Sequence, residues 1–449
     1  MSTRKLNGPL GGEYLIDGTG NAILMADSPI TDDNRLGARL TTAEETLVTQ
    51  GGRILTEEKR STSQGRGLLA PNPGAARWIP PAKIMTSSPT ITLGTMNASP
   101  TISSPLVFNE DHPAFRYFGT EPVTVSLWRK FGTHTNYWAV DFMTDAPDLE
   151  ISSQAQASGA GYRLIVDGEF VTADVQAGQT GGGGNYYLKV AFGSSKPRHV
   201  VLEMSNSFYF GGVYIAASYM VWKSSTPLGP RVAFLGDSIV AGATVNGVQA
   251  WPIECSRLLG WRDVQTAAVG GTGYLAVNPS ANTFRDRITS ITNARLWADG
   301  ASGTPDVVIV AGGTNDAGAY TASAIQAEAI TLFNAIRTSL PNAVLIVFSQ
   351  YRQNGSPDQT TIDLRNAIQT AAATTGAHLF IDQIVATTAG ANSLGWITGT
   401  GKAGSTNGTG NADRYVSSDG THPTLAGQQY LGSRAAQAIA AAMPILGAS

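Results

Sequence analysis

The spacing of hydrophobic residues changes twice along this chain. From about Asn109 to Ser225, apolar residues tend to recur at every second position, as in "VTVSLW", "WAVDF", "YYLKVAF" and "RHVVLEM". An alternation of this kind is typical of half-buried β-strands. In "YRLIVDGEFV" the pair Asp167-Gly168 separates two short apolar runs, which predicts a β-hairpin. These segments, with no helical stretch between them, predict a jelly-roll-like all-β sandwich over residues 106–227.

From Arg231 onward, continuous apolar runs alternate with helix-like segments. The runs are "VAFLG", "DVQTAAV", "DVVIVAGG", "AVLIVFS" and "HLFID". Strands buried on both faces have this composition, and helices between them allow the strands to run parallel. We therefore expect residues 228–449 to form an α/β domain with helices on both faces of a parallel sheet. The helices are expected at Gln249–Leu259, Ser323–Leu340, Thr360–Thr374 and Leu425–Ala442.

Residues 1–105 show neither pattern and are expected to form an extended N-terminal arm. One helix is expected near "TTAEETLVTQ", where a threonine can cap the first turn and a glutamate can stabilise it. Later stretches such as "STSQGRGLLAPNPGAARWIPPAK" are rich in Pro, Ser and Gly and cannot build a core alone. Such an arm is either disordered or ordered against a partner, and we expect the second.

Composition and charge exclude several classes of function. The net charge of −3 and the pI of about 6.0 give no electrostatic basis for binding nucleic acid or an anionic membrane. The one cysteine, Cys255, excludes an internal disulfide framework, and the five histidines lack metal-ligand spacing. We therefore expect no metal and no other cofactor. No apolar run has the length of a membrane helix or of a signal-peptide core, so a soluble protein without a secretion signal is expected.

Polar and glycine-rich clusters follow the predicted strands, at the edge of the sheet where α/β proteins bind their ligands. In chain order they are "GDS" at 236–238, "GGTGY" at 270–274, "GGTND" at 312–316 and "DGTH" at 419–422. Each has an ordinary explanation: a helix cap, a tight turn, a turn closed by side chains, and a surface histidine at a helix start. Their occurrence together at one edge of the sheet is more informative than any one of them.

Taken together, the clusters contain the groups that acyl transfer requires. The hydroxyl of Ser238 becomes a nucleophile when a base removes its proton, and the imidazole of His422 titrates near neutrality. Asp419, three residues before His422, can hold the imidazole in the required tautomer. The backbone N–H groups of Ser238 and Gly271 and the side-chain amide of Asn315 can bind the oxyanion of a tetrahedral intermediate.

The four clusters resemble the sequence blocks of the SGNH/GDSL hydrolases. The matching stretches are "FLGDSIVAG", "AAVGGTGY", "GGTNDAG" and "SDGTHPTLAG", which occur in the order that the family shows. The resemblance covers roughly Arg231 to Ser449 and implies a flavodoxin-like parallel sheet.

The resemblance also implies a role for each matching residue. It implies a catalytic triad of Ser238, Asp419 and His422, and an oxyanion hole completed by Gly271 and Asn315. Gly270 or Gly273 is an alternative to Gly271 as the backbone donor.

The regions before the α/β domain carry two weaker resemblances. A β-sandwich placed before such a domain is similar to the two-domain acetyl esterases of carbohydrate esterase family two, on the stretches "YRLIVDGEF" and "RHVVLEM". The arm looks like the attachment region of a bacteriophage tail fibre or tailspike. This likeness implies a virion location, contacts with other virion proteins, and a homo-oligomer, with a trimer as the first candidate. Together the resemblances imply a serine esterase that removes O-acetyl groups from an acetylated polysaccharide.

A long glycine-rich loop over residues 384–417 directly precedes "DGTH" and is expected to border the cleft. Trp396 in this loop and Tyr274 in "GGTGY" are candidate substrate-binding residues, although Trp396 can instead anchor its loop. Two other functions stay open. One is a lipase or thioesterase, and the other is a non-catalytic virion or glycan-binding protein on the same fold. The second is disfavoured because no member of the triad is missing.

Overall fold

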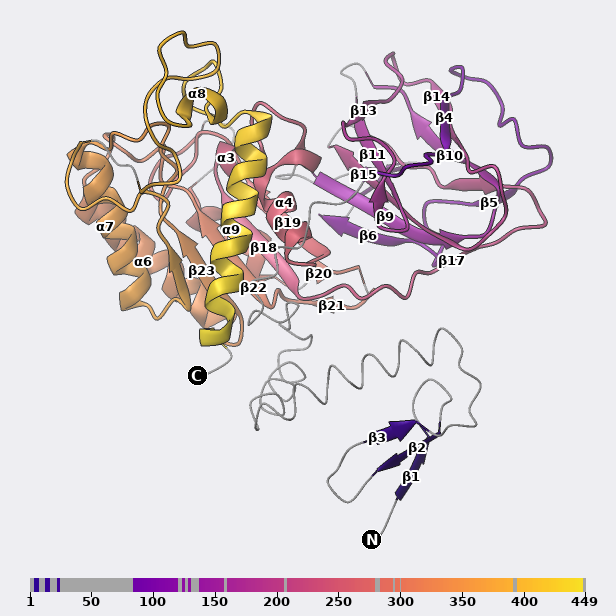
Figure 1. The fold of residues 1–449 in the computed structure, drawn as a ribbon, viewed down its shortest axis with the longest axis horizontal. Coiled ribbons are helices and arrows are strands. Elements are labelled where there is room, and N and C mark those ends of the chain that lie inside the picture. Colours follow the sequence, from indigo (N-terminus) through magenta and orange to yellow (C-terminus); the bar gives the residue numbers. More distant parts are fainter. Residues whose placement is uncertain are drawn as a thin grey trace. The chain divides into compact units, whose positions relative to one another are not determined.

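The computed structural model describes residues 84–446, apart from 120–122, 126–127, 131–136, 157–159, 206–207, 279–282, 294, 299 and 391–393. It also describes three short strands before residue 25. The chain divides into two units, Met1–Leu69 with Ile445–Ser449, and Ala70–Pro444. The second unit holds the two domains that the sequence predicts (Figure 1).

The first unit contains a small antiparallel sheet that the sequence analysis did not predict. Its strands β1 (Arg4–Asn7), β2 (Glu13–Ile16) and β3 (Ala22–Leu24) pair in the order β1-β2-β3. Strands of three or four residues are too short to show a clear alternation, although glycine-containing stretches of sequence separate them. The helix expected near residues 41–50 lies outside the described residues.

The predicted β-sandwich is confirmed. Its strands are β4 (Thr90–Leu93), β5 (Leu106–Phe108), β6 (Arg116–Gly119), β7 (Val123–Val125), β8 (Trp128–Lys130), β9 (Tyr137–Thr144), β10 (Asp148–Gln154), β11 (Gly161–Val166), β12 (Glu169–Phe170), β13 (Gln176–Ala177), β14 (Asn185–Ala191), β15 (Arg198–Ser205), β16 (Val213–Ile215) and β17 (Val221–Trp222). One sheet has the order β4-β14-β10-β16-β5. The other has the order β12-β11-β15-β9-β17, with β13 paired to β11 and β6 to β9.

The period of two explains how the sandwich buries its core. On β9, the apolar side chains of Trp138, Val140 and Phe142 point into the cluster between the two sheets and are fully buried. The Asp-Gly hairpin is also present: Val166 pairs with Glu169, and both turn residues have positive φ, 52° at Asp167 and 84° at Gly168. Positive φ at both central positions is the reason that this turn favours Asp-Gly.

Two details of the β region differ from the expectation. Strand β4 lies within the segment assigned to the arm, yet it pairs with β14 and forms the edge of a sandwich sheet. The sandwich therefore begins before Thr90, and not at residue 106. The stretch "VTVSLW", expected as one strand, is divided between β7 and β8, which pair with each other through Val125 and Trp128. The two short strands continue one alternating pattern. The sequence therefore did not reveal that the stretch contains two strands.

The α/β domain contains a five-stranded parallel sheet, as predicted. Its elements are β18 (Arg231–Gly236), α3 (Ser238–Ala241), a 3₁₀ turn η1 (Gly247–Gln249), α4 (Trp251–Leu258), β19 (Asp263–Ala268), a 3₁₀ turn η2 (Arg285–Arg287), α5 (Thr289–Thr292), β20 (Arg295–Leu296), β21 (Ser302–Gly303), β22 (Val307–Ala311), α6 (Ala322–Ser339), β23 (Val344–Phe348), α7 (Gln359–Thr374), β24 (Leu379–Ile381), α8 (Ala412–Tyr415) and α9 (Leu425–Leu446). The sheet order is β19-β18-β22-β23-β24, the 2-1-3-4-5 order of flavodoxin-like folds. The order reverses beside β18, so the ends of β18 and β22 flank the crevice where such folds bind ligands.

Helices cover both faces of this sheet (Figure 1). Apolar residues of α6 and α7 pack with one face of the strands in a single buried cluster. On the other face, Trp251 of α4 packs against Phe234 and Phe348 of the strands. Gln428 of α9 accepts a hydrogen bond from the backbone N–H of Trp251, at 2.9 Å, and joins α9 to α4.

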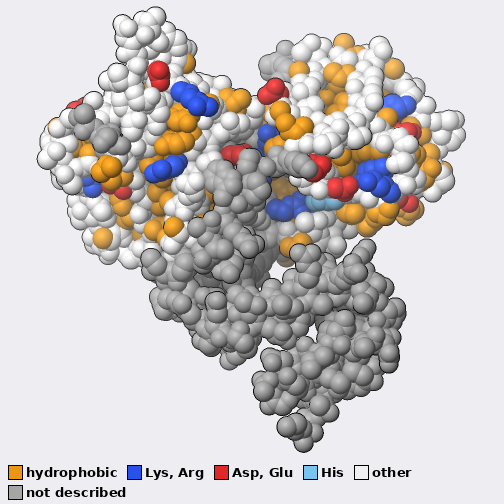
Figure 2. All heavy atoms as spheres, in the orientation of Figure 1, with side chains coloured by type: hydrophobic (Ala, Val, Ile, Leu, Met, Phe, Trp, Pro, Cys, Tyr) orange, Lys and Arg blue, Asp and Glu red, His pale blue; other side chains and the backbone are white. Residues whose placement is uncertain are grey.

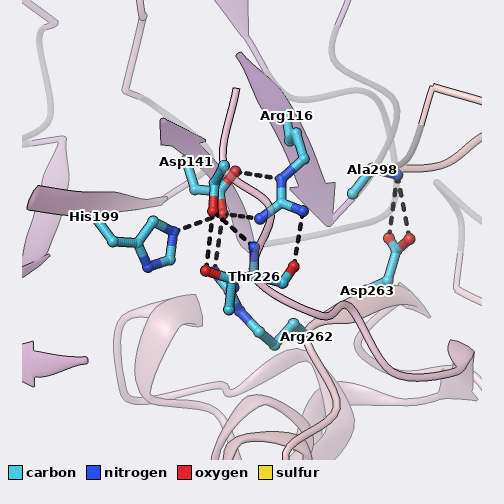
Figure 3. A network of polar contacts seen from close by, with 8 residues as sticks. Arg116, Asp141, His199, Thr226, Arg262, Asp263 and Ala298 are labelled. Atoms are coloured by element: carbon cyan, nitrogen blue, oxygen red, sulfur yellow. Dashed lines mark hydrogen bonds and ion pairs between the residues drawn. The ribbon is translucent and has the colours of Figure 1, made fainter. Parts of the chain in front are cut away.

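The sandwich contacts the α/β domain through charged side chains (Figure 3). Asp141 of β9 is fully buried and accepts hydrogen bonds from Arg116 of β6, with Nε–Oδ1 at 2.8 Å. His199 of β15 binds the same carboxylate through Nε2, at 2.8 Å. Arg262, which lies between α4 and β19, reaches it across the domain boundary, with Nη2–Oδ2 at 3.0 Å. The polar side of the β9 alternation therefore faces the neighbouring domain.

A second cluster at the same boundary also joins a carboxylate of the sandwich to arginines. Glu203 of β15 binds Arg163 of the sandwich and Arg257 of α4, each at 2.8 Å. The guanidinium groups of both arginines lie over the ring of Phe170, at 4.3 and 5.1 Å. Stacking on an aromatic ring suits the weakly hydrated guanidinium group. Each cluster therefore places one carboxylate of the sandwich between arginines from both domains.

The surface shows no gathering of one charge on the face drawn in Figure 2. Among the described residues, basic and acidic side chains are scattered between hydrophobic and uncharged ones. This distribution agrees with the small net charge of the chain. None of the helices in the described part of the chain combines the length and the apolar character that crossing a bilayer requires.

Candidate active site

Ser238 lies in the sharp turn between β18 and α3. Gly236 ends the strand where a Cβ would lie 2.5 Å from the carbonyl oxygen of Ala311 on β22, so only glycine fits this approach. Asp237 is the N-cap of α3, and its Oδ1 accepts a hydrogen bond from the N–H of Ile239, at 2.9 Å. The cap is therefore Asp237, and Ser238 is the half-buried first residue of the helix. Its hydroxyl is not needed for capping.

Asp419 and His422 lie on a closed loop before α9. The N–H of Ser417 donates to the carbonyl oxygen of His422 at 2.7 Å, and the N–H of Gly420 donates to that of Ser417 at 2.9 Å. Thr244, just after α3, donates its hydroxyl to the carbonyl oxygen of Pro423, at 2.6 Å. This bond fixes the loop to the segment that carries Ser238.

The structure brings the three predicted triad residues together. Nε2 of His422 lies 2.9 Å from Oγ of Ser238, and Nδ1 lies 2.7 Å from Oδ2 of Asp419. The other carboxylate oxygen accepts hydrogen bonds from the hydroxyl of Ser417 and from the N–H groups of Thr421 and His422. Loss of water around Asp419 raises its pKa, but these hydrogen bonds and the one from the His422 ring outweigh that effect and hold the pKa below its usual value.

The glycine block lies beside the serine. An added Cβ on Gly270 would lie 3.4 Å from Cβ of Ser238, and Gly271 has a φ of +75°, which favours glycine. In the part of the chain that the structure describes, no hydrogen-bond acceptor is assigned to the N–H of Ser238, Gly270 or Gly271. The N–H of Gly273, by contrast, donates to the carbonyl oxygen of Ala276 at 2.9 Å. Gly273 is therefore a poor candidate for the backbone donor.

Asn315 follows β22 and faces the glycine block. Its Nδ2 donates to the carbonyl oxygen of Thr272, at 2.9 Å, which fixes the amide plane. The amide nitrogen carries a second hydrogen that this bond does not use. The side chain is half-buried, so this hydrogen is available to a bound oxyanion.

Asp316 is a supporting residue, which the sequence suggested only as part of a turn closed by side chains. Its buried carboxylate accepts hydrogen bonds from the N–H groups of Tyr274, Leu275 and Ala276, at 2.8 to 2.9 Å. Burial raises the pKa of Asp316, although the three backbone bonds act in the opposite direction. This side chain fixes the segment that follows the glycine block. Its place beside Asn315 in "GGTND" was the available signal.

Residues 234–430 match the family model described as "GDSL-like Lipase/Acylhydrolase family". The C-terminal domain is a GDSL/SGNH lipase-acylhydrolase domain. A comparison with curated proteins finds no match.

Solved structures with the same fold cover the sandwich as well as the GDSL/SGNH domain. A salicylyl-acyltransferase from a tetracycline biosynthetic pathway is 17% identical, with a TM-score of 0.57 over 77% of this chain and 99% of that one. A family two carbohydrate esterase from Clostridium thermocellum, in complex with cellohexaose, is 15% identical, with a TM-score of 0.52 over 72% and 98%. An acetyl xylan esterase from the rumen bacterium Butyrivibrio proteoclasticus is 14% identical, with a TM-score of 0.50 over 79% and 98%.

The prediction that Tyr274 contacts substrate is wrong. Its side chain is 0% exposed and packs between Phe284 and Phe333 in the core of the GDSL/SGNH domain. Burial raises the pKa of its phenol well above the usual value. The hydrogen bond from its backbone N–H to Asp316 fixes the local chain so that the ring points inward.

Trp396 is also buried, at 5% exposed, and acts mainly as a loop anchor. Its ring packs against Phe348, and its backbone N–H donates to the carbonyl oxygen of Gln383, at 2.9 Å. It nevertheless contributes to the wall of a pocket at the ends of β23 and β24. The lining residues are Tyr351, Arg352, Asn354, Pro357, Gln383, Ile384, Trp396 and Ile397.

This pocket lies close to the site. The carbonyl oxygen of Tyr351 accepts a hydrogen bond from the hydroxyl of Thr314, at 3.0 Å, and Thr314 directly precedes Asn315. Burial raises the pKa of Tyr351, and the charge of Asp419 adds to this effect. Among the described residues, no group of His, Cys, Asp or Glu side chains could hold a metal ion.

Proposed function

We propose that this protein is a serine esterase in which Ser238 is the nucleophile, His422 the general base and Asp419 the group that orients the base. The observation that carries the proposal is the position of the His422 ring between Ser238, at 2.9 Å, and Asp419, at 2.7 Å. The oxygen of a serine hydroxyl attacks an ester only when a base removes its proton. Here the base and its orienting carboxylate are already in hydrogen-bond contact.

In the acylation step, Oγ of Ser238 attacks the ester carbonyl carbon while its proton moves to Nε2 of His422. The carbonyl π-electrons move onto oxygen and form a tetrahedral oxyanion. When this intermediate collapses, the bond between carbon and the alcohol oxygen breaks, and His422 returns the proton to the departing alkoxide. Asp419 remains ionised and stabilises the imidazolium, in keeping with its lowered pKa.

The oxyanion has three candidate donors in this site. They are the backbone N–H groups of Ser238 and Gly271 and the second amide hydrogen of Asn315. Preformed donors stabilise the charge that develops on oxygen without reorganising during the reaction. The deacylation step repeats the sequence with water as the nucleophile: His422 takes a proton from water, and Ser238 leaves as the alcohol.

For the substrate, we propose an O-acetyl ester on a polysaccharide. One of the similar structures is described as a family two carbohydrate esterase in complex with cellohexaose, and another as an acetyl xylan esterase. A lipase or thioesterase, which would need an apolar channel for the acyl chain, stays the alternative.

Acyl transfer to an alcohol is a second candidate, because another similar structure is described as an acyltransferase. The acyl-enzyme is the same in both reactions, and only the acceptor differs. Release of free acetate from an acetylated polysaccharide supports the esterase. Transfer of the acetyl group to an added alcohol, with little free acetate, supports the acyltransferase.

The test of the nucleophile is hydrolysis of p-nitrophenyl acetate and of acetylated xylan by the wild type and by Ser238→Ala. We expect the variant to lose nearly all activity while keeping its melting temperature. Ser339→Ala is the matched control, since this exposed serine ends α6 at the opposite edge of the sheet. Comparable turnover by Ser238→Ala would refute the assignment. A wild type that is inactive on all esters would favour the non-catalytic alternative.

The virion role of the arm stays a prediction supported by composition alone. The arm was expected to span residues 1–105, but β4 belongs to the sandwich. We therefore propose that removing residues 1–83 leaves esterase activity in place and abolishes higher assembly. Light scattering on the full-length and shortened chains tests this, with a trimer as the expected state of the full chain. A full-length monomer would contradict it.

A further inference from the structure

A buried arginine lies beneath the site and has no part in the chemistry described so far. Arg287 is the last residue of η2 and is 4% exposed. Its Nη2 donates to the carbonyl oxygen of Gly236, at 3.1 Å, and to the hydroxyl of Thr272, at 2.9 Å. One nitrogen atom therefore joins the end of the nucleophile strand to the glycine block.

Thr272 extends this connection to the third block of the site. Its side chain is fully buried, and its hydroxyl donates to the carbonyl oxygen of Val269, at 2.7 Å. Its own carbonyl oxygen accepts the hydrogen bond from the amide of Asn315. Thr272 directly follows Gly271 and supplies the acceptor for Asn315. It is therefore held at both its side chain and its carbonyl group. A shift of Thr272 would move two of the candidate oxyanion donors together, the Gly271 N–H and the Asn315 amide.

The charge of Arg287 also points to a role beyond packing. Burial lowers its pKa to about 10, although Asp237 and Asp286 act in the opposite direction, so the group stays protonated at neutral pH. Its Nε and Nη1 atoms have no hydrogen-bond partner among the described residues. An incompletely bonded buried cation costs stability. A cation beneath an oxyanion hole would also favour the negative charge that develops there.

We propose that Arg287 is a positioning residue of the oxyanion hole: through Thr272 it holds the Gly271 N–H and the Asn315 amide in place relative to Ser238. The proposal rests on the esterase function proposed above. Arginine suits this task because its planar guanidinium group can direct one nitrogen at two oxygens while its charge is fixed. Lysine carries the charge but lacks the rigid geometry.

The test compares Arg287→Met, Arg287→Lys and Thr272→Val with the wild type in p-nitrophenyl acetate hydrolysis. Rates are expressed per active serine, counted by labelling with a fluorophosphonate. We expect Arg287→Met to lower kcat by about 10- to 100-fold with little change in KM, because oxyanion stabilisation acts in the transition state. Arg287→Lys should recover part of kcat. Thr272→Val should lower kcat in the same direction.

The double variant Arg287→Met with Thr272→Val separates positioning from independent effects. If both residues act through one connection, the double variant loses no more kcat than Arg287→Met alone. Arg198→Met is the control for removing a buried arginine, since Arg198 is 3% exposed and binds carbonyl groups within the sandwich. It should lower the melting temperature and leave kcat unchanged.

Each outcome decides the proposal. Wild-type kcat in Arg287→Met, with only a lower melting temperature, would show a purely structural arginine and overturn it. Fully additive losses in the double variant would also overturn it. If Arg287→Met does not fold, the variants Thr272→Val and Arg287→Lys test the proposal instead. A wild-type kcat in both of them would refute the positioning role of Arg287. A wild type that neither turns over esters nor reacts with fluorophosphonate refutes the esterase function, and the role of Arg287 with it.

Discussion

Two histidine–aspartate pairs in this chain have almost the same distance between ring nitrogen and carboxylate oxygen, and different surroundings. His422 lies 2.7 Å from Asp419, and His199 lies 2.8 Å from Asp141. The first pair lies at the edge of the parallel sheet, and the second lies at the boundary between the domains (Figure 3). Distance between ring and carboxylate therefore does not distinguish an active site from a structural contact.

The difference lies in what else each pair contacts. The second ring nitrogen of His422 faces the hydroxyl of Ser238, and the side chains of His422 and Asp419 are 24% and 43% exposed. Asp141 is fully buried and is shared between His199 and two arginines. Burial raises the pKa of Asp141, but the bonds from Arg116 and His199 and the charge of Arg262 hold it below its usual value. A base requires a nucleophile and access for substrate, and only the first pair has both.

The largest expected effect separates the two histidines. His422→Ala should lower kcat by about 10⁴-fold or more, because it removes the general base. His199→Asn should leave kcat unchanged and lower stability by roughly 1–3 kcal/mol, because it disturbs a buried hydrogen bond to a charged group. Ester hydrolysis and thermal unfolding of the two variants measure both effects. A loss of kcat in His199→Asn would remove the distinction between the pairs.

The next largest effect concerns the oxyanion donors, which have no counterpart at the His199–Asp141 pair. Asn315→Ala should lower kcat by about 10²–10³-fold, the usual loss for one donor. Asn334→Ala, at an exposed position of α6, is the matched control. A variant in which only KM rises would show that Asn315 binds substrate and does not stabilise the oxyanion.

A change of stability without a change of kcat is expected at the domain boundary. Asp141→Asn should lower the free energy of unfolding by about 3 kcal/mol at neutral pH, because it leaves buried arginines without their counter-charge. The pKa of Asp141 is lowered on folding, so the stability from its ionised form is present above the unfolded pKa of about 3.9 and is lost as the pH falls through the folded value. Urea unfolding at several pH values should therefore show that the difference in free energy of unfolding between the wild type and Asp141→Asn becomes smaller in acid. A difference that is constant with pH would contradict this account.

The last prediction is that removing divalent metal ions has no effect. EDTA should change neither the turnover of esters nor the melting temperature, because the proposed triad and oxyanion donors are protein groups. Activity that is lost in EDTA and restored by a divalent ion would contradict the proposed mechanism.

The α/β domain was predictable because its strands and helices have strong local signals. Strands buried on both faces are continuous apolar runs, and "DVVIVAGG" and "AVLIVFS" became β22 and β23. The proximity of Ser238, Asn315 and His422 could also be inferred, since the carboxyl ends of parallel strands share one edge. The chemistry at that edge depends on residue types that stand out in the sequence.

Contacts between distant segments were not predictable. Arg287 and its acceptor Gly236 are 51 residues apart, and Arg262 and Asp141 are 121 residues apart. No local pattern marks such an arginine as buried. Tyr274 was misjudged for a similar reason: its place in a glycine-rich turn suggested exposure, whereas the hydrogen bond to Asp316 directs the ring into the core.

The two charged clusters at the domain boundary have a consequence for the history of such proteins. A boundary held by apolar side chains would expose a sticky surface if one domain were lost, and the remaining part would aggregate. At this boundary, Asp141, Glu203 and their arginines would instead become hydrated ions. Loss of one domain would then expose ionic groups at these two clusters, and charged groups disfavour the apolar association that causes aggregation. A boundary of this chemistry is suited to joining or separating the two domains by recombination.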